Sequence, residues 1–247
     1  SLVFTLSNAV GPVTMILGGK INDSIGPKMV LIVGGVMFGA GQIIAGFSTS
    51  LGMLMFGYGI LCGLGAAMVY SCNVSTCVKY FPDKKGLAGG LATASYGISS
   101  VVVSKVAGYI IETYSVTTAF KALGIVALII IVSGALYVGQ GSGKGAGKVQ
   151  IPVTDKDRNW KQMLSTPQFY IMACILLCGA VSGMMCISQA SAVAQKMAGM
   201  TPSQAATIVA VLALFNSGGR IVAGYISDKI GRTNTLIKAS VISFIGL

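Results

Sequence analysis

Long apolar stretches run through nearly the whole chain and are separated by short polar connections. A helix that crosses the roughly 30 Å apolar core of a bilayer needs about 20 apolar residues in succession, and most of these stretches reach that length. A soluble fold could not bury them, because 54% of the 247 residues are hydrophobic and only 9% are charged, against about 25% charged in an ordinary soluble domain. The pattern therefore predicts an all-α membrane protein.

The apolar stretches predict seven complete membrane-spanning helices and the start of an eighth. Their expected ranges are 1–19, 29–48, 51–79, 86–111, 117–138, 167–196, 203–226 and from 235 onward. The 34 glycines of the chain suit this arrangement, since small residues let membrane helices approach each other closely. Both ends of the chain lie inside apolar stretches, so we expect the complete protein to have further helices on either side.

The connections between the predicted spans are of two alternating kinds. The first kind holds 13 of the 17 lysines and arginines. It comprises residues 20–28, 79–85, 139–166 and 227–238. The second kind, around 49–51, 112–116 and 197–202, has neither lysine nor arginine. By the positive-inside rule the basic connections are cytoplasmic. The net charge of +11 thus follows from membrane topology and does not indicate a nucleic-acid partner.

The longest connection, residues 139–166, divides the chain. We expect an N-terminal helical bundle over 1–138, without its first helix, and the beginning of a C-terminal bundle over 167–247. The connection starts with a glycine-rich run and continues with a charged one, a composition typical of a solvated linker. A short amphipathic helix at the membrane surface is expected around Trp160.

Two of the basic connections share a sequence pattern. The segment GGKINDSIGPKMVLI (18–32) aligns without gaps with AGYISDKIGRTNTLI (223–237), at an offset of 205 residues. Because both copies lie on the same side of the membrane, the two halves are predicted to be parallel repeats. Such repeats are typical of transporters.

The repeated segment resembles the cytoplasmic signature loop of the major facilitator superfamily, Gly-x-x-x-Asp-x-x-Gly-Arg/Lys. Three further segments resemble the oxalate/formate antiporter family: YFPDKKGLAGGLATASYG (80–97), VTDKDRNWKQMLSTPQFY (153–170) and LFNSGGRIVAGYISDKIGR (214–232). The resemblance implies a major facilitator fold of twelve helices, of which the chain supplies helices two to eight and part of nine. We also expect a multi-pass protein of the plasma membrane that is monomeric at full length.

Each signature loop offers a carboxylate, a flexible glycine and a cation. The predicted set is Gly19, Asp23, Gly26 and Lys28 in the first loop, and Gly224, Asp228, Gly231 and Arg232 in the second. A carboxylate at a helix end can interact with the N-terminus of a neighbouring helix, and glycine permits a tight turn. The resemblance implies that these charges latch one conformation of the transport cycle. A loop that only fixes topology is the alternative.

Arg220 is the candidate substrate ligand. It lies in an apolar stretch eight residues before Asp228, hence about 12 Å inside the membrane at 1.5 Å per residue. An arginine near the middle of a bilayer costs about 2.5–3.5 kcal/mol to insert, so a functional role is expected. Its planar guanidinium matches a carboxylate. The alternative is a structural arginine that pairs with a carboxylate on another helix.

Tyr70 and Tyr96 fall at a similar depth, about 13–15 Å from the basic connections. Phenolic hydroxyls near the middle of a bilayer need partners, and an anion pocket supplies them. Both positions also match tyrosines that line the substrate cavity of the family that the chain resembles. Core packing with an internal hydrogen bond is the alternative for each. Asn216, one turn from Arg220, is placed to orient the guanidinium, whereas Lys105 is expected near the outer surface.

These residues indicate a secondary active transporter of small carboxylate anions, such as oxalate and formate, that alternates access to a site in the middle of the membrane. A proton-coupled carrier of lactate or pyruvate is the close alternative, and a transporter-like receptor is a more distant one. We expect no enzyme, because no cluster of catalytic side chains is present. We expect no cofactor or metal either, and interpret Cys174 and Cys178 as packing residues.

Overall fold

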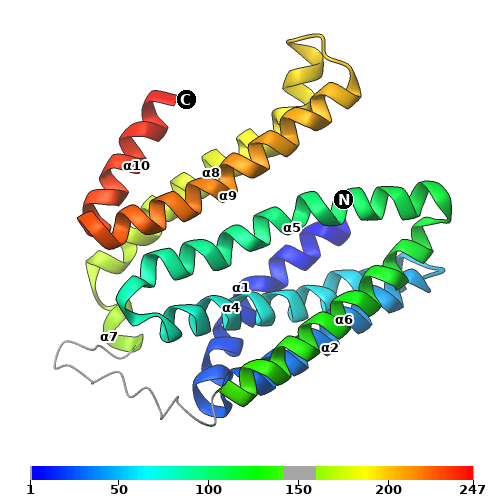
Figure 1. The fold of residues 1–247 in the computed structure, drawn as a ribbon, viewed down its shortest axis with the longest axis horizontal. Coiled ribbons are helices and arrows are strands. Elements are labelled where there is room, and N and C mark those ends of the chain that lie inside the picture. The colour runs from blue at the N-terminus through cyan, green and yellow to red at the C-terminus, as the bar shows by residue number, and fades with distance from the viewer. Residues whose placement is uncertain (1, 142–159, 247) are drawn as a thin grey trace.

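A computed structural model describes residues 2–141 and 160–246 of the chain, and every regular element in these ranges is a helix (Figure 1). In chain order the elements are α1 (Leu2–Ile25), α2 (Pro27–Gly46), α3 (Leu51–Leu54), η1 (Met55–Cys62), α4 (Gly63–Tyr80), η2 (Pro82–Lys84), α5 (Lys85–Thr113), α6 (Val116–Gly141), α7 (Trp160–Leu164), α8 (Pro167–Lys196), α9 (Pro202–Ile230) and α10 (Arg232–Gly246). The expected linker lies mostly outside the described residues. Its expected helix at Trp160 is present as α7.

Six helical stretches in the described part of the chain are long and apolar enough to cross a membrane. They are Pro27–Gly46, Leu51–Tyr80, Pro82–Thr113, Val116–Val138, Pro167–Ile187 and Thr207–Ile230. They agree with six of the seven complete spans that the sequence predicts. The predicted first span corresponds to α1, which has 24 residues but is not among the six. Its apolar run is interrupted by polar side chains such as Asn8 and Thr14.

The predicted span 51–79 is not one regular α-helix. Ser50 caps its start by accepting a hydrogen bond from the Met53 N–H, and the stretch Met55–Cys62 is π-helical. Here the chain packs closely on α2, since a Cβ added at Gly41 would lie 2.5 Å from the backbone nitrogen of Cys62. A π-helical turn is rare and occurs mostly as a local insertion in α-helices, so apolar periodicity did not predict it.

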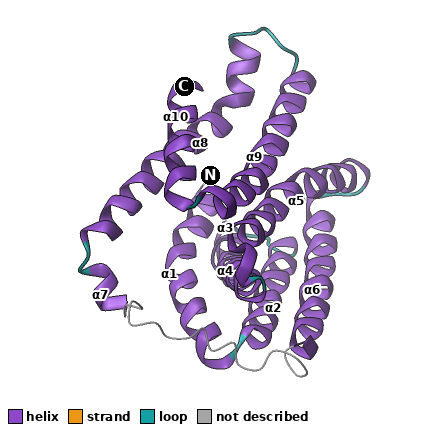
Figure 2. Ribbon diagram, turned by 60° about the vertical axis from the view of Figure 1, so that its left-hand side comes forward, coloured by secondary structure: helices purple, strands orange, loops and turns teal. Residues whose placement is uncertain are grey.

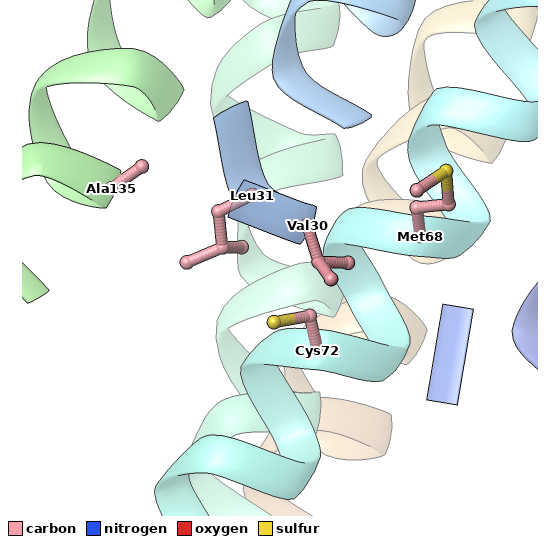
Figure 3. Close-up of a cluster of buried hydrophobic side chains, with 5 residues drawn as sticks. All are labelled: Val30, Leu31, Met68, Cys72 and Ala135. Carbon is pink, nitrogen blue, oxygen red and sulfur yellow. The ribbon is translucent and has the colours of Figure 1, made fainter. Parts of the chain in front are cut away.

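A cluster of buried hydrophobic side chains lies where α2, α4 and α6 meet. Figure 3 shows this cluster, which consists of Val30, Leu31, Met68, Cys72 and Ala135. Small residues bring the helices together around it. For example, a Cβ added at Gly65 would overlap the backbone of Phe38 on α2. Most other apolar side chains face outward, which suits helices surrounded by lipid or by further helices.

The two aligned signature glycines end helices in the same backbone conformation. Gly26 has φ 93° and ψ 164°, and Gly231 has φ 87° and ψ 156°. Only glycine adopts this region readily, and a new helix begins directly after each one. The structure therefore has a tight turn at each of these glycines, and the two aligned positions share one backbone conformation.

The helices pack in two groups that are joined by α5 and α9 (Figure 2). In the first group α2 packs against α6 and α4, and α4 packs against α1 and α5. In the second group α9 packs against α8 and α10. The contact between α5 and α9 is close near the start of α5 and the end of α9, and the two helices separate further along (Figure 1).

Candidate functional site

Arg220 connects the two groups of helices. Its Nε donates a hydrogen bond to Asn216 Oδ1 at 3.1 Å, one turn back on α9. Its Nη1 donates to the backbone carbonyl of Thr93 on α5 at 3.2 Å. The first contact is the one that the one-turn spacing predicts. The second was not predictable from the sequence, because every residue has a carbonyl and no pattern marks the one at Thr93.

The guanidinium of Arg220 keeps donors for a further ligand. Arginine has five N–H donors, and two of them make the contacts with Asn216 and Thr93. The residue is exposed, and no carboxylate among the described residues pairs with it. An arginine fork with donors to spare, held in place at its Nε, is suited to bind a planar carboxylate with two parallel hydrogen bonds.

Tyr70 and Tyr96 are neighbours across α4 and α5. Their ring centroids are 5.3 Å apart and the rings are inclined at 68°, the edge-to-face geometry that aromatic pairs favour. Tyr70 is half-buried, whereas the side chain of Tyr96 is 62% exposed. Tyr96 lies three residues after Thr93, the acceptor of Arg220, so the pair lies one helical turn from the arginine contact.

Small residues let α5 and α9 approach at this point. On α5 they are Gly86, Gly90, Ala94 and Gly97. A Cβ added at Gly90 would overlap the carbonyl of Arg220, and one added at Gly224 would overlap the carbonyl of Gly86. Small residues at intervals of three or four are the signal for such a crossing. The four small residues of α5 were not among the site residues predicted from the sequence.

Asp228 caps the first turn of α5. Its Oδ1 accepts a hydrogen bond from the Gly86 N–H at 2.7 Å, and its Oδ2 accepts one from the Leu87 N–H at 2.8 Å. These N–H groups have no partner within their own helix, and the cap residue Lys84 supplies no side-chain acceptor. A carboxylate from the second signature loop thus occupies the position that a local Asp or Ser usually fills.

The first signature loop is held by a buried polar cluster. Asn22 is 5% exposed, and its amide donates to Ser75 Oγ on α4 at 2.9 Å. The Cys72 thiol lies 3.5 Å from Asn22 Oδ1 and 3.6 Å from the Pro27 carbonyl, so it contacts both sides of the turn. The side chain of Asp23 is outside the described part of the structure.

The other predicted signature residues lie in the helices on either side of these turns. Gly19 is in α1, where an added Cβ would meet nothing within 4 Å. Lys28 and Arg232 are exposed in the first turns of α2 and α10. On α8, Cys174 and Cys178 are exposed and unpaired. Across the described ranges, no group of three or more His, Cys, Asp or Glu side chains is placed to hold a metal ion.

Comparison with known proteins gives a consistent set of relatives. Residues 1–247 match the profile of the Major Facilitator Superfamily. The chain is 32% identical over 231 residues to an Escherichia coli (strain K12) protein named as the uncharacterized MFS-type transporter YhjX, an alignment that covers 94% of the chain and 57% of the relative. It is 33% identical over 233 residues to the oxalate:formate antiporter of Oxalobacter formigenes. This alignment covers 94% of the chain and 55% of the relative.

A shorter similarity extends to animal carriers. Human monocarboxylate transporter 12 is 34% identical over 134 residues, which cover 53% of the chain and 26% of that protein. All three relatives are named as transporters. The chain spans 57% and 55% of the two relatives that match most of it, or about half their length.

Proposed function

The chain belongs to the major facilitator superfamily, and we propose that it is part of a secondary active transporter that carries small carboxylate anions of the oxalate or formate kind. The observation that carries the proposal is Arg220, which is held by Asn216 and Thr93 with donors to spare about 12 Å from the membrane surface at Asp228. The oxalate:formate antiporter, 33% identical over 94% of the chain, supports the same class of substrate.

Arg220 binds a carboxylate group of the substrate through the guanidinium N–H donors that are not bonded to Asn216 or Thr93. Its hydrogen bond to Asn216 fixes the plane of the guanidinium, so less rotamer freedom is lost when the anion binds. Tyr70 and Tyr96 line the same region and offer phenolic hydroxyls to the anion. An anion at this depth also offsets part of the cost of keeping a charged arginine in the membrane.

Transport follows from movement of the two groups of helices, which we assign to bundles over 1–138 and 167–247. In the structure α5 and α9 are in close contact at the end where Asp228 caps α5, which is the basic, cytoplasmic end of both helices. They diverge toward the opposite end (Figure 1). This arrangement corresponds to a carrier that is closed to the cytoplasm and open to the outside. The signature loops, with Asp228 as the contact residue, latch this state.

A proton-coupled monocarboxylate carrier is the second candidate. The observation that favours it is the similarity of about half the chain to monocarboxylate transporter 12. Proton coupling needs a titratable group within the membrane, and the sequence has no histidine. In the described spans the acidic side chains lie at the ends, with Asp83 and Asp228 at the basic end and Glu112 near the opposite end of α5. A carrier that exchanges carboxylates therefore agrees better with these residues than a proton-coupled carrier does. We propose no enzymatic activity for the protein.

Uptake of radiolabelled anions by proteoliposomes that contain the full-length protein tests the proposal. We expect saturable uptake of oxalate or formate that is accelerated when the vesicles are preloaded with a carboxylate. A proton gradient alone should have little effect. Uptake of lactate or pyruvate that depends on a proton gradient would favour the second candidate. Failure of every small carboxylate to enter or to compete would contradict both.

We place the protein in the plasma membrane, with the linker 139–166 in the cytoplasm. In a background without native cysteines, single cysteines at residues 50 and 199 should react with a membrane-impermeant thiol reagent added to intact cells. A cysteine at residue 147 should react only after the membrane is permeabilised. The reason is the distribution of lysine and arginine among the connections. Labelling with the opposite pattern would reverse the orientation and place both signature loops outside.

A further inference from the structure

Ser217 has a buried hydroxyl without a hydrogen-bond partner. The residue is 1% exposed, and its Oγ is the single buried side-chain oxygen or nitrogen without a partner among the described residues. A hydroxyl in this situation has lost its water and gained nothing in exchange. Such groups are rare in folded proteins and call for an explanation. Ser217 lies on α9, three residues before Arg220.

Contact with α5 accounts for the position of this hydroxyl. Serines in a helix usually donate to a carbonyl in the preceding turn, and Ser95, Ser99, Ser100 and Ser104 on α5 all do so. Ser217 makes no such bond. Its Oγ instead faces Gly97, where an added Cβ would overlap it. The hydroxyl is therefore enclosed by the helix crossing itself.

We propose that the contact between Ser217 and Gly97 is a built-in bias against the cytoplasm-closed state, which keeps that state from becoming too stable to reopen. The inference rests on the alternation of access in the proposed function. Asp228 and the glycines of α5 and α9 stabilise closure, and the unsatisfied hydroxyl opposes them. When α5 and α9 part, Ser217 regains water or bonds to a carbonyl of its own helix.

Two substitutions at this contact have opposite expected effects. Ser217→Ala removes the hydroxyl while keeping Cβ, so the closed state no longer contains an unsatisfied group and becomes more populated. Gly97→Ala adds a methyl group where Ser217 Oγ lies, so the closed state becomes less populated. Leaving a buried polar group without a partner costs about 1–3 kcal/mol. We therefore expect Ser217→Ala to raise the ratio of closed to open molecules by about five-fold or more.

Each substitution has a matched control on α5. Gly108→Ala makes the same change as Gly97→Ala on the same helix, at a position where an added Cβ meets nothing within 4 Å. Ser100→Ala removes a serine hydroxyl that already donates to the Gly97 carbonyl and is exposed. Both controls should leave the ratio of closed to open molecules within about two-fold of the unsubstituted protein, since Gly108 has open space around it and the Ser100 hydroxyl is not enclosed by the helix crossing.

Distances between spin labels measure the ratio directly. We place labels at Lys84 before α5 and at Thr233 in α10, two exposed positions at the cytoplasmic ends of the two groups, in the full-length protein in lipid. Short distances report closed molecules and long distances report open ones. We expect Ser217→Ala to increase the short-distance fraction and Gly97→Ala to increase the long-distance fraction. The readout needs no substrate, so it is independent of whether the proposed carboxylates are transported.

The double variant Gly97→Ala with Ser217→Gly distinguishes the proposed contact from general damage to α5. It removes the oxygen that the new methyl group overlaps, so the short-distance fraction should return toward that of the unsubstituted protein. If Gly97→Ala fails to fold, the inference is tested by comparing the short-distance fractions of Ser217→Ala and Ser100→Ala alone. An unchanged or smaller short-distance fraction in Ser217→Ala would overturn the inference.

Discussion

Arg220→Ala is expected to reduce carboxylate uptake by at least about 30-fold while leaving the amount of protein in the membrane nearly unchanged. Removing one partner of a hydrogen-bonded pair between charges costs about 2–5 kcal/mol, and about 1.4 kcal/mol corresponds to a factor of ten. The helix itself should tolerate the change. Arg220 contacts Asn216 and a backbone carbonyl, and neither group is left as a buried charge when the guanidinium is removed.

Arg220→Lys separates charge from geometry. Lysine keeps the positive charge but has no planar fork, so it cannot make two parallel hydrogen bonds to a carboxylate. We expect weak uptake with a raised KM. Lys105→Ala is the matched control, since it removes a cation from an exposed position of α5, about 28 Å from Gly86 along the helix. It should retain most of the uptake.

Thermal melting distinguishes a substrate ligand from a structural arginine. A ligand that binds only the folded protein raises the apparent melting temperature. The unsubstituted protein should show a melting shift that depends on carboxylate concentration, and Arg220→Ala should be folded but show none. If a folded Arg220→Ala protein is stabilised by the same anion, Arg220 is not in the site. If the variant is strongly destabilised before any anion is added, the alternative of a structural arginine holds.

The helical spans and the signature turns could be predicted from the sequence because their causes are local. An apolar run of sufficient length has to cross the membrane as a helix, and six of the predicted spans are found as such. A glycine at the end of such a run can adopt the positive φ that Gly26 and Gly231 show, which other residues adopt at a cost. Depth along a helix is also local, so the sequence predicts Arg220 and Tyr96 near the middle of the membrane, and this stays a prediction.

The contacts across α5 and α9 could not be predicted in the same way. The acceptor of Arg220 is a backbone carbonyl at Thr93, and the enclosure of Ser217 depends on its position opposite Gly97. Both require the rotation and offset of two helices whose contacting residues are more than 100 positions apart in sequence. A stripe of small residues indicates that a helix packs closely, but it does not identify the partner helix or the register.

Asp228→Ala is expected to open the cytoplasmic end and to lower exchange of carboxylates by about ten-fold or more. The variant leaves the Gly86 and Leu87 N–H groups at the start of α5 without the acceptors they have now, and loss of a helix cap alone costs about 0.5–2 kcal/mol. The favourable interaction of a carboxylate with the positive end of the helix is lost as well. With the spin labels at Lys84 and Thr233, the long-distance fraction should rise, which is the shift expected for Gly97→Ala.

Asp228→Asn and Asp83→Asn identify the cause of that shift. Asn at position 228 keeps one oxygen acceptor but not the charge, so we expect an intermediate effect. Asp83→Asn removes the same charge three residues before Gly86 but leaves the Asp228 contact in place, so its distance distribution should be unchanged. If Asp83→Asn opens the cytoplasmic end as far as Asp228→Ala does, the general charge of the surface controls closure. If only the changes at Asp228 act, closure depends on the hydrogen bonds to the start of α5. The second signature loop then controls access through the contact that Asp228 makes with α5, in the first half of the chain.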